Sequence, residues 1–163
     1  MTIQQQVESE LTRWGGGPTQ LTIDTEVGQV AAQIQDLDRI GCTFSSLAVR
    51  SDRLAGATPD QMRQVGDDLA GRLSYLMEPI SPIEIDREGA VVQLRSQPPQ
   101  QDDDGSTYFE LLVRRDGLTL ERYQKAVGAV RQKVPAQVTR VILGRLADDL
   151  HPRVSGLTWD AIG

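Results

Sequence analysis

Apolar residues recur at helical spacing near the start of the chain. Over residues 2–14 the large apolar side chains stand three or four positions apart with polar residues between them, namely Ile3, Val7, Leu11 and Trp14. This pattern is typical of an amphipathic helix of about three turns. Gly15–Gly17 and Pro18 predict where it ends, because glycine loses much backbone entropy in a helix and the residue before a proline disfavours helical geometry.

Two further helices are predicted from their start signals and their apolar faces. Thr58 precedes Pro59 and stands three residues before Gln61. These are the residues of a capped helix start, because the threonine hydroxyl accepts an N–H, proline needs no donor, and glutamine reaches back to the cap. This helix is expected to end at Pro79. A last helix is expected at about 135–150, followed by a tail at 151–163.

Alternation of apolar and polar residues predicts strands between these helices. The expected strands cover about 21–23, 30–34, 43–51, 83–86, 90–96, 108–115 and 118–123. Their connections are too short for parallel crossovers, so we expect antiparallel pairing, with the helices on one face of the sheet or at its edges. The predicted fold class is α+β with antiparallel sheet and a C-terminal helix.

Three pairs of short segments resemble one another in the same order along the chain. Ile23–Val30 resembles Ile85–Val91, Leu47–Leu54 resembles Leu111–Leu118, and the helix start Pro59–Met62 resembles Pro135–Val138. We interpret them as two repeated helix-plus-three-strand units, at about 1–57 and 58–123. Neither unit can bury an apolar face alone, so both are expected to share one core in a single domain, 1–163.

Composition and charge exclude several classes of protein. The 163 residues are 39% apolar and 25% charged, with a formal net charge of −6. This acidity argues against nucleic acid or an anionic membrane as a partner. The chain has no basic leader and no apolar run long enough to cross a membrane, so we expect a cytoplasmic protein. With one cysteine, Cys42, and one histidine, His151, we expect no disulfide, metal site or cofactor.

Candidate catalytic groups have plainer structural interpretations. Asp102–Asp104 lack the flanking acids of a calcium loop and are expected to form a solvated turn. His151 is expected to stabilise a helix end, and Cys42 to be a small buried side chain, although a pairing of the two in space is not excluded. Glu84 and Asp86 share a strand face without a burial signal. No catalytic residue is predicted.

Two arginines stand at corresponding places in the proposed repeat. Arg50 and Arg114 each end a strand, and each precedes an aspartate by two positions. If the two halves pack about a pseudo-two-fold axis, these arginines converge and bind an anion such as phosphate or carboxylate. The alternative interpretation is a pair of solvated Arg–Asp contacts at the strand ends.

Apolar side chains outside the expected core point to a protein partner. The strand at 108–113 is apolar on both faces, with Tyr108 and Leu112 on the side opposite Phe109. A strand of this kind needs cover on both sides, from helices or from a second subunit. Together with Trp14 and Trp159, Tyr108 and Leu112 are the predicted contacts with a protein partner or a second copy of the chain.

The order of the predicted elements, together with small size and acidity, resembles the type III secretion chaperone-like fold group over roughly residues 2–150. The resemblance rests on layout and carries over no functional residues. It implies a non-enzymatic dimer that holds an extended segment of another protein along apolar grooves. The sequence therefore predicts a protein-interaction or chaperone-like module. The alternative is a domain that binds a small molecule or anion at the seam between the two halves, and an enzyme is the third possibility.

Overall fold

The fold is described from a computed structural model covering residues 1–14, 16–26 and 28–151. Over these residues the chain forms three α-helices, one short 3₁₀ helix and ten strands. The helices are α1 (Ile3–Trp14), α2 (Pro59–Arg72), η1 (Leu73–Leu76) and α3 (Arg140–Leu150). Trp159 and the rest of the predicted tail from residue 152 lie outside the described residues.

The strands form one sheet in which every pairing between described residues is antiparallel. The strand order is β1-β2-β3-β8-β7-β5-β4, with the short strands β6, β9 and β10 beside β7, β8 and β3. Their bounds are β1 (Thr19–Thr25), β2 (Gly28–Leu37), β3 (Gly41–Arg50), β4 (Ile80–Asp86), β5 (Val91–Ser96), β6 (Gln100–Asp102), β7 (Gly105–Arg114), β8 (Gly117–Lys125), β9 (Gln132–Val134) and β10 (Ala136–Thr139). The α+β class and the C-terminal helix predicted from the sequence are confirmed.

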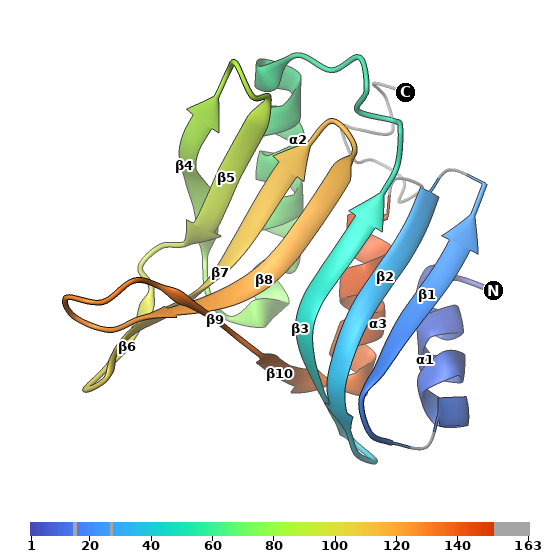
Figure 1. The fold of residues 1–163 in the computed structure, drawn as a ribbon. Helices are drawn as coiled ribbons and strands as arrows, with labels where there is room; N and C mark the ends of the chain where they lie inside the picture. The colour runs from blue at the N-terminus through green and yellow to red at the C-terminus, as the bar shows by residue number, and fades with distance from the viewer. Residues whose placement is uncertain (15, 27, 152–163) are drawn as a thin grey trace.

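The three α-helices lie on one face of the sheet (Figure 1). α1 and α3 pack together against the β1–β3 part, and α2 covers β4, β5 and β7. The strand residues that face the helices are buried, for example Val49, Leu94, Leu111 and Leu120. Burying a side chain of this size stabilises a fold by about 1.5–3 kcal/mol relative to leaving it in water. Within the described residues no helix covers the opposite face, which we call the open face.

The predicted start of α2 is confirmed in atomic detail. The Thr58 hydroxyl accepts a hydrogen bond from the backbone N–H of Gln61 at 3.1 Å, and the Gln61 side chain accepts one from the Thr58 N–H at 2.9 Å. Each bond satisfies a backbone donor that would otherwise lack a partner at the helix end. The sequence therefore specified this boundary locally.

The predicted start of the last helix is wrong. α3 begins at Arg140 rather than at about residue 135, and residues 136–139 form β10. β10 pairs with the first residues of β3, from Ala136 opposite Phe44 to Thr139 opposite Gly41. Thr139 then caps the helix by accepting from the Ile142 N–H at 3.0 Å. A distant strand edge thus satisfies backbone groups of these four residues in place of another helical turn.

The two parts of the sheet meet at β3 and β8. These strands pair over four residues on each, Leu47–Arg50 with Gly117–Leu120. Beyond these four residues, β10 pairs with the start of β3 at Gly41–Phe44, and β9 pairs with β8 at Arg122–Gln124. β8 therefore lies between β3 and β7, the third long strands of the two proposed repeat units. β6 and β8 have no counterpart after α1 in the described residues, so the repeat itself stays a prediction.

Candidate functional site

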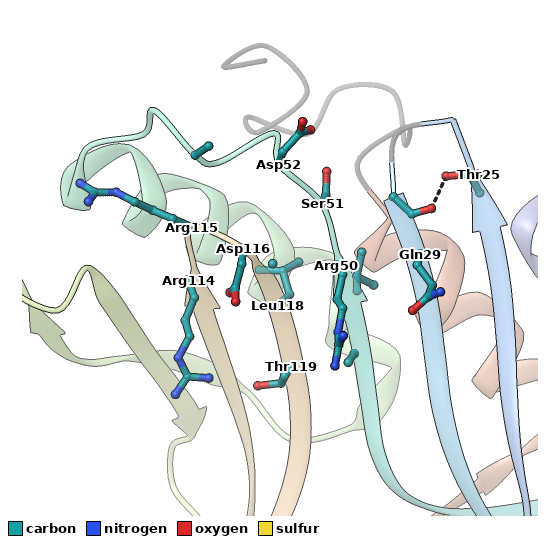
Figure 2. Close-up of a pocket in the computed structure, with 15 residues that line it drawn as sticks. Thr25, Gln29, Arg50, Ser51, Asp52, Arg114, Arg115, Asp116, Leu118 and Thr119 are labelled. Atoms are coloured by element: carbon teal, nitrogen blue, oxygen red, sulfur yellow. Dashed lines mark hydrogen bonds between the residues drawn. The ribbon is translucent and has the colours of Figure 1, made fainter.

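Arg50 and Arg114 lie on either side of Gly117 at one level of the sheet. In the strand register Arg50 is opposite Gly117, and Gly117 is opposite Arg114. Directly opposite residues point to the same face of a sheet, and neighbouring strands are about 4.8 Å apart, which places the two Cα atoms about 10 Å from each other. Figure 2 shows both side chains extended on the open face with Thr119 between them. The structure thus brings together the two arginines singled out in the sequence.

The two arginines line a cleft of about 990 Å³ at the end of the open face. β2, β3 and β8 form its floor, the turn between β7 and β8 forms one side, and the chain leaving β3 toward α2 forms another. Its polar lining includes Gln29, Ser51 and Thr119. Four other clefts on the described part of the chain have volumes of about 300, 360, 400 and 480 Å³. Both arginine side chains are exposed to solvent, so a ligand has direct access to their guanidinium groups.

The expected alternative, two Arg–Asp ion pairs at the strand ends, is not formed. Asp52 and Asp116 also line the cleft, but neither Arg50 nor Arg114 makes an ion pair or hydrogen bond through its side chain with a described residue. Both arginines are exposed. A third arginine, Arg115, is held by the chain, because its Nε donates to the Ala57 carbonyl at 3.2 Å. Two guanidinium groups therefore remain available to a ligand.

Glycines on both neighbouring strands allow the backbone to close around Arg50. A Cβ at Gly28 of β2 would overlap the carbonyl oxygen of Arg50, and a Cβ at Gly117 of β8 would overlap that of Val49. Gly117 also has a φ of +145°, which side-chain-bearing residues rarely adopt. The Ser51 N–H donates to the Asp116 carbonyl at 3.0 Å and ties the end of β3 to the β7–β8 turn. The position of both arginines is thus fixed by the backbone.

Small or apolar side chains form the next row of the open face. Ala31 is opposite Ala48, Ala48 is opposite Thr119, and Thr119 is opposite Leu112. Leu112, a predicted partner contact, is half-buried on the open face beside Thr119. It lies two residues before Arg114 on the same strand and so borders the arginine row. The structure therefore places Leu112 next to the cleft.

Tyr108 does not form the exposed contact surface that was predicted. Its side chain is 5% exposed because the chain after β8 folds back over it. The Arg131 guanidinium lies 3.5 Å from the Tyr108 hydroxyl and stacks 3.9 Å above the ring of Tyr123. The two tyrosine rings are stacked with centroids 6.1 Å apart. The second apolar face of β7 is therefore covered at this point by the same chain.

A buried carboxylate beneath Arg131 was not predicted from the sequence. Glu110 is 2% exposed, and its Oε1 accepts from Arg131 at 3.0 Å and from the Gln93 side chain. Bonding to Tyr108 and Glu110 raises the pKa of Arg131 above its usual range. The available sequence signal was a charged residue inside the apolar run of 108–113, but its partner stands 21 residues further along the chain.

A second partly buried ion pair lies on the helix side of the sheet. The Arg122 guanidinium is 3.0 Å from a carboxylate oxygen of Glu78 and 4.4 Å from the centre of the Phe109 ring. The other Glu78 oxygen accepts from the Ser96 hydroxyl at 2.8 Å. This network joins β8, β7 and β5 to the end of η1, and we interpret it as structural.

Cys42 and His151 are far apart. His151 is buried at the end of α3, where its Nε2 lies 2.8 Å from the Thr25 hydroxyl at the end of β1. Cys42 is buried near the start of β3, eight residues before Arg50, or about 25 Å along a strand. Burial raises the pKa of the Cys42 thiol to about 11. The two residues therefore form no common site.

The remaining candidates from the sequence lie on the surface. Glu84 and Asp86 are exposed on the edge strand β4, and the Asp86 carboxylate accepts from the Gly89 N–H at 2.9 Å. In the exposed turn between β6 and β7, Asp102 accepts from the Asp104 N–H at 2.8 Å. Across the described ranges no three histidine, cysteine or acidic side chains are grouped so that they could hold a metal ion.

Trp14 is the last residue of α1 and is 50% exposed. Arg140 links the end of α1 to the turn between β2 and β3. Its guanidinium lies 3.3 Å from the Thr12 hydroxyl, and its backbone N–H donates to the Ile40 carbonyl at 2.8 Å. Ile40 is 73% exposed and Val141 is 56% exposed. We refer to Trp14, Ile40 and Val141 as the apolar end surface.

Among residues 1–14, 16–26 and 28–151, no helix combines the length and apolar character needed to cross a bilayer. The chain was also compared with protein-family models, curated proteins and solved structures, and none of them matches it.

Proposed function

We propose that the protein binds an anionic small molecule in the cleft between Arg50 and Arg114. The observation that carries this proposal is the placement of both arginines on one face, on either side of Gly117. Gly117 has no side chain, so the strand between the two arginines is bare at their own level, and the Thr119 hydroxyl lies between the guanidinium ends (Figure 2). Guanidinium groups donate paired hydrogen bonds that match the oxygens of phosphate and carboxylate.

The expected affinity of a simple anion is modest. A hydrogen bond to a charged group contributes about 1.5–3 kcal/mol, and part of this is lost in ordering the long arginine side chains. Two arginines acting together support a dissociation constant on the order of 0.1–1 mM for inorganic phosphate. Because both side chains are exposed, this affinity falls with added salt.

Isothermal titration calorimetry with inorganic phosphate tests the proposal on the full chain. Arg50→Gln and Arg114→Gln each weaken binding by about tenfold, which corresponds to the loss of one charged hydrogen-bonding group. The matched control is Arg39→Gln, which removes an exposed arginine from the turn between β2 and β3. Phosphate binding that is unchanged in a variant carrying both Arg50→Gln and Arg114→Gln, or that is absent from the wild type, contradicts the proposal.

A second candidate function is self-association through the apolar end surface. Trp14, Ile40 and Val141 are 50%, 73% and 56% exposed, and the contacts of Arg140 with Thr12 and with the Ile40 carbonyl bring together the segments that carry them. Apolar surface of this kind is often covered by another subunit. A dimer is also what the resemblance to the type III secretion chaperone-like group implies.

Light scattering at tens of micromolar protein tests this second function. A dimer mass is expected for the wild type, and Ile40→Ser shifts it toward the monomer. Val127→Ser is the matched control, because Val127 is 97% exposed in the loop between β8 and β9. A monomer mass for the wild type contradicts self-association and leaves the anion site untouched.

A further inference from the structure

We infer that the ligand of this cleft carries one anionic group attached to an apolar body about the size of an aromatic ring or a short alkyl chain. The inference rests on the proposed function and names the class of ligand. It follows from the order of side chains along the open face, from the arginine row toward the middle of the sheet.

The first step is the row next to the arginines. Ala48 and Thr119 line the cleft beside Arg50 and Arg114, and Leu112 lies opposite Thr119 on β7. Alanine and threonine project little above the sheet, and Leu112 offers an apolar side wall. An anion held by both arginines therefore has a low, largely apolar floor directly beside it, and burying apolar surface there favours binding.

The second step sets the length of the apolar body. Successive residues on one face of a strand are about 7 Å apart, so Leu112 stands about 7 Å from Arg114. The next residue on that face of β7 is Glu110, whose carboxylate is engaged by Arg131 and Gln93. One ring or a short chain therefore fits between the arginine row and the acidic row. The acidic row consists of Glu110 and Glu121, which are opposite each other and are paired with Arg131 and Lys133, so a second negative group at the far end of the ligand would find these two cations already engaged.

The third step limits the anionic group to one. The Nε of Arg115 donates to the Ala57 carbonyl, and its guanidinium points away from the other two arginines (Figure 2), so Arg50 and Arg114 are the lining cations that can hold one anion together. Asp52 and Asp116 line the same cleft and repel additional negative charge. A single phosphate or carboxylate matches this balance, and a polyphosphate or a nucleic acid strand does not.

Calorimetry with two matched pairs of probes tests the inference. Phenyl phosphate is compared with inorganic phosphate, and benzoate is compared with acetate, on the full chain. The ring is expected to increase affinity by about tenfold within each pair, from the apolar area it buries. The two pairs also distinguish a site for phosphate from a site for carboxylate, since only the preferred head group binds measurably at low millimolar concentration.

Two variants test whether the ring of the ligand binds over this floor. Leu112→Ala removes the side wall and Ala48→Leu fills the floor, and each is expected to reduce the affinity ratio within a pair to near one. Ile83→Ala, an exposed side chain on the edge strand β4, is the control and leaves the ratio unchanged. Thermal melting identifies a variant that does not fold, and Leu112→Ala then decides, because Leu112 is only half-buried.

The outcomes separate this inference from the proposed function. If inorganic phosphate or acetate binds through the arginines but the ring adds nothing, the apolar body is wrong and the anion site stands. If the ring adds affinity that neither Leu112→Ala nor Ala48→Leu reduces, the body lies elsewhere and the inference is wrong. If none of the four probes binds, the anion site itself is wrong.

Discussion

The Cα of Gly117 lies so close to the carbonyl oxygen of Val49 that any side chain at position 117 would overlap it. Gly117 is opposite both Arg50 on β3 and Arg114 on β7, so the two arginines lie at one level of the sheet. The close approach and the positive φ of Gly117 therefore connect the stability of the sheet with the geometry of the cleft.

Gly117→Ala is expected to destabilise the protein by about 2 kcal/mol or more, because alanine must adopt an unfavourable φ and displace backbone atoms of β3. Urea unfolding followed by circular dichroism measures the loss. Gly56→Ala is the control, because a Cβ at Gly56 meets nothing within 4 Å in the chain between β3 and α2. Equal stability of Gly117→Ala and the wild type contradicts the backbone constraint.

Arg131→Ala is expected to destabilise the protein by about 1–3 kcal/mol, since it leaves the buried Glu110 carboxylate without its charged partner. The lower part of this range allows for Arg131 being 39% exposed. The same urea experiment measures the effect. Adding Glu110→Gln to Arg131→Ala should restore part of the stability. If the double variant is less stable than Arg131→Ala, an unpaired charge is not the cause.

The thiol of Cys42 is expected to react slowly while the protein is folded. Burial raises its pKa to about 11, so little of the reactive thiolate is present near neutral pH, and the side chain is 1% exposed. Reaction with a disulfide reagent at mildly alkaline pH should be at least about tenfold slower in buffer than in denaturing urea. Equal rates in the two conditions contradict the burial of Cys42.

Asp38 makes part of the stability dependent on pH. Its carboxylate accepts from the backbone N–H groups of Gly41 at 2.6 Å and Ile40 at 2.9 Å, and these bonds lower its pKa. A carboxyl whose pKa is lowered on folding stabilises the fold above its unfolded pKa, and the contribution is lost as the pH falls through the folded pKa.

Asp38→Ala should therefore be less stable than the wild type near neutral pH, and the difference should shrink below about pH 4. Urea midpoints measured at neutral pH and at about pH 3 give the two differences. A difference that is the same at both pH values shows that the Asp38 charge does not contribute to the turn between β2 and β3.

Local signals in the sequence identified those boundaries that local contacts specify. The start of α2 was predicted because the side chains of Thr58 and Gln61 each bond to the other's backbone, within four residues. The start of α3 was not, because residues 136–139 pair with β3, almost a hundred positions earlier. The pattern of residues 136–139 alone does not indicate that they pair with this distant strand.

The candidate site shows the same division. Arg50 and Arg114 were recognised because each ends a strand and precedes an aspartate, which is a local pattern. Their convergence depends on β8 lying between β3 and β7, a matter of strand order. The cover over Tyr108 was missed because Arg131 approaches it from a separate part of the chain. A strand that is apolar on both faces indicated that cover was needed, but not its source.

The short ladder between β3 and β8 has a mechanical consequence for the cleft. Four residues of each strand join the two parts of the sheet there, with Arg50 on one side of the junction and Arg114 on the other. A ligand bound by both side chains would connect the two parts of the sheet across the shortest ladder in the order β1-β2-β3-β8-β7-β5-β4. Occupancy would then restrain the two parts from shearing past each other, and the amides of Leu47–Arg50 would exchange their hydrogens more slowly.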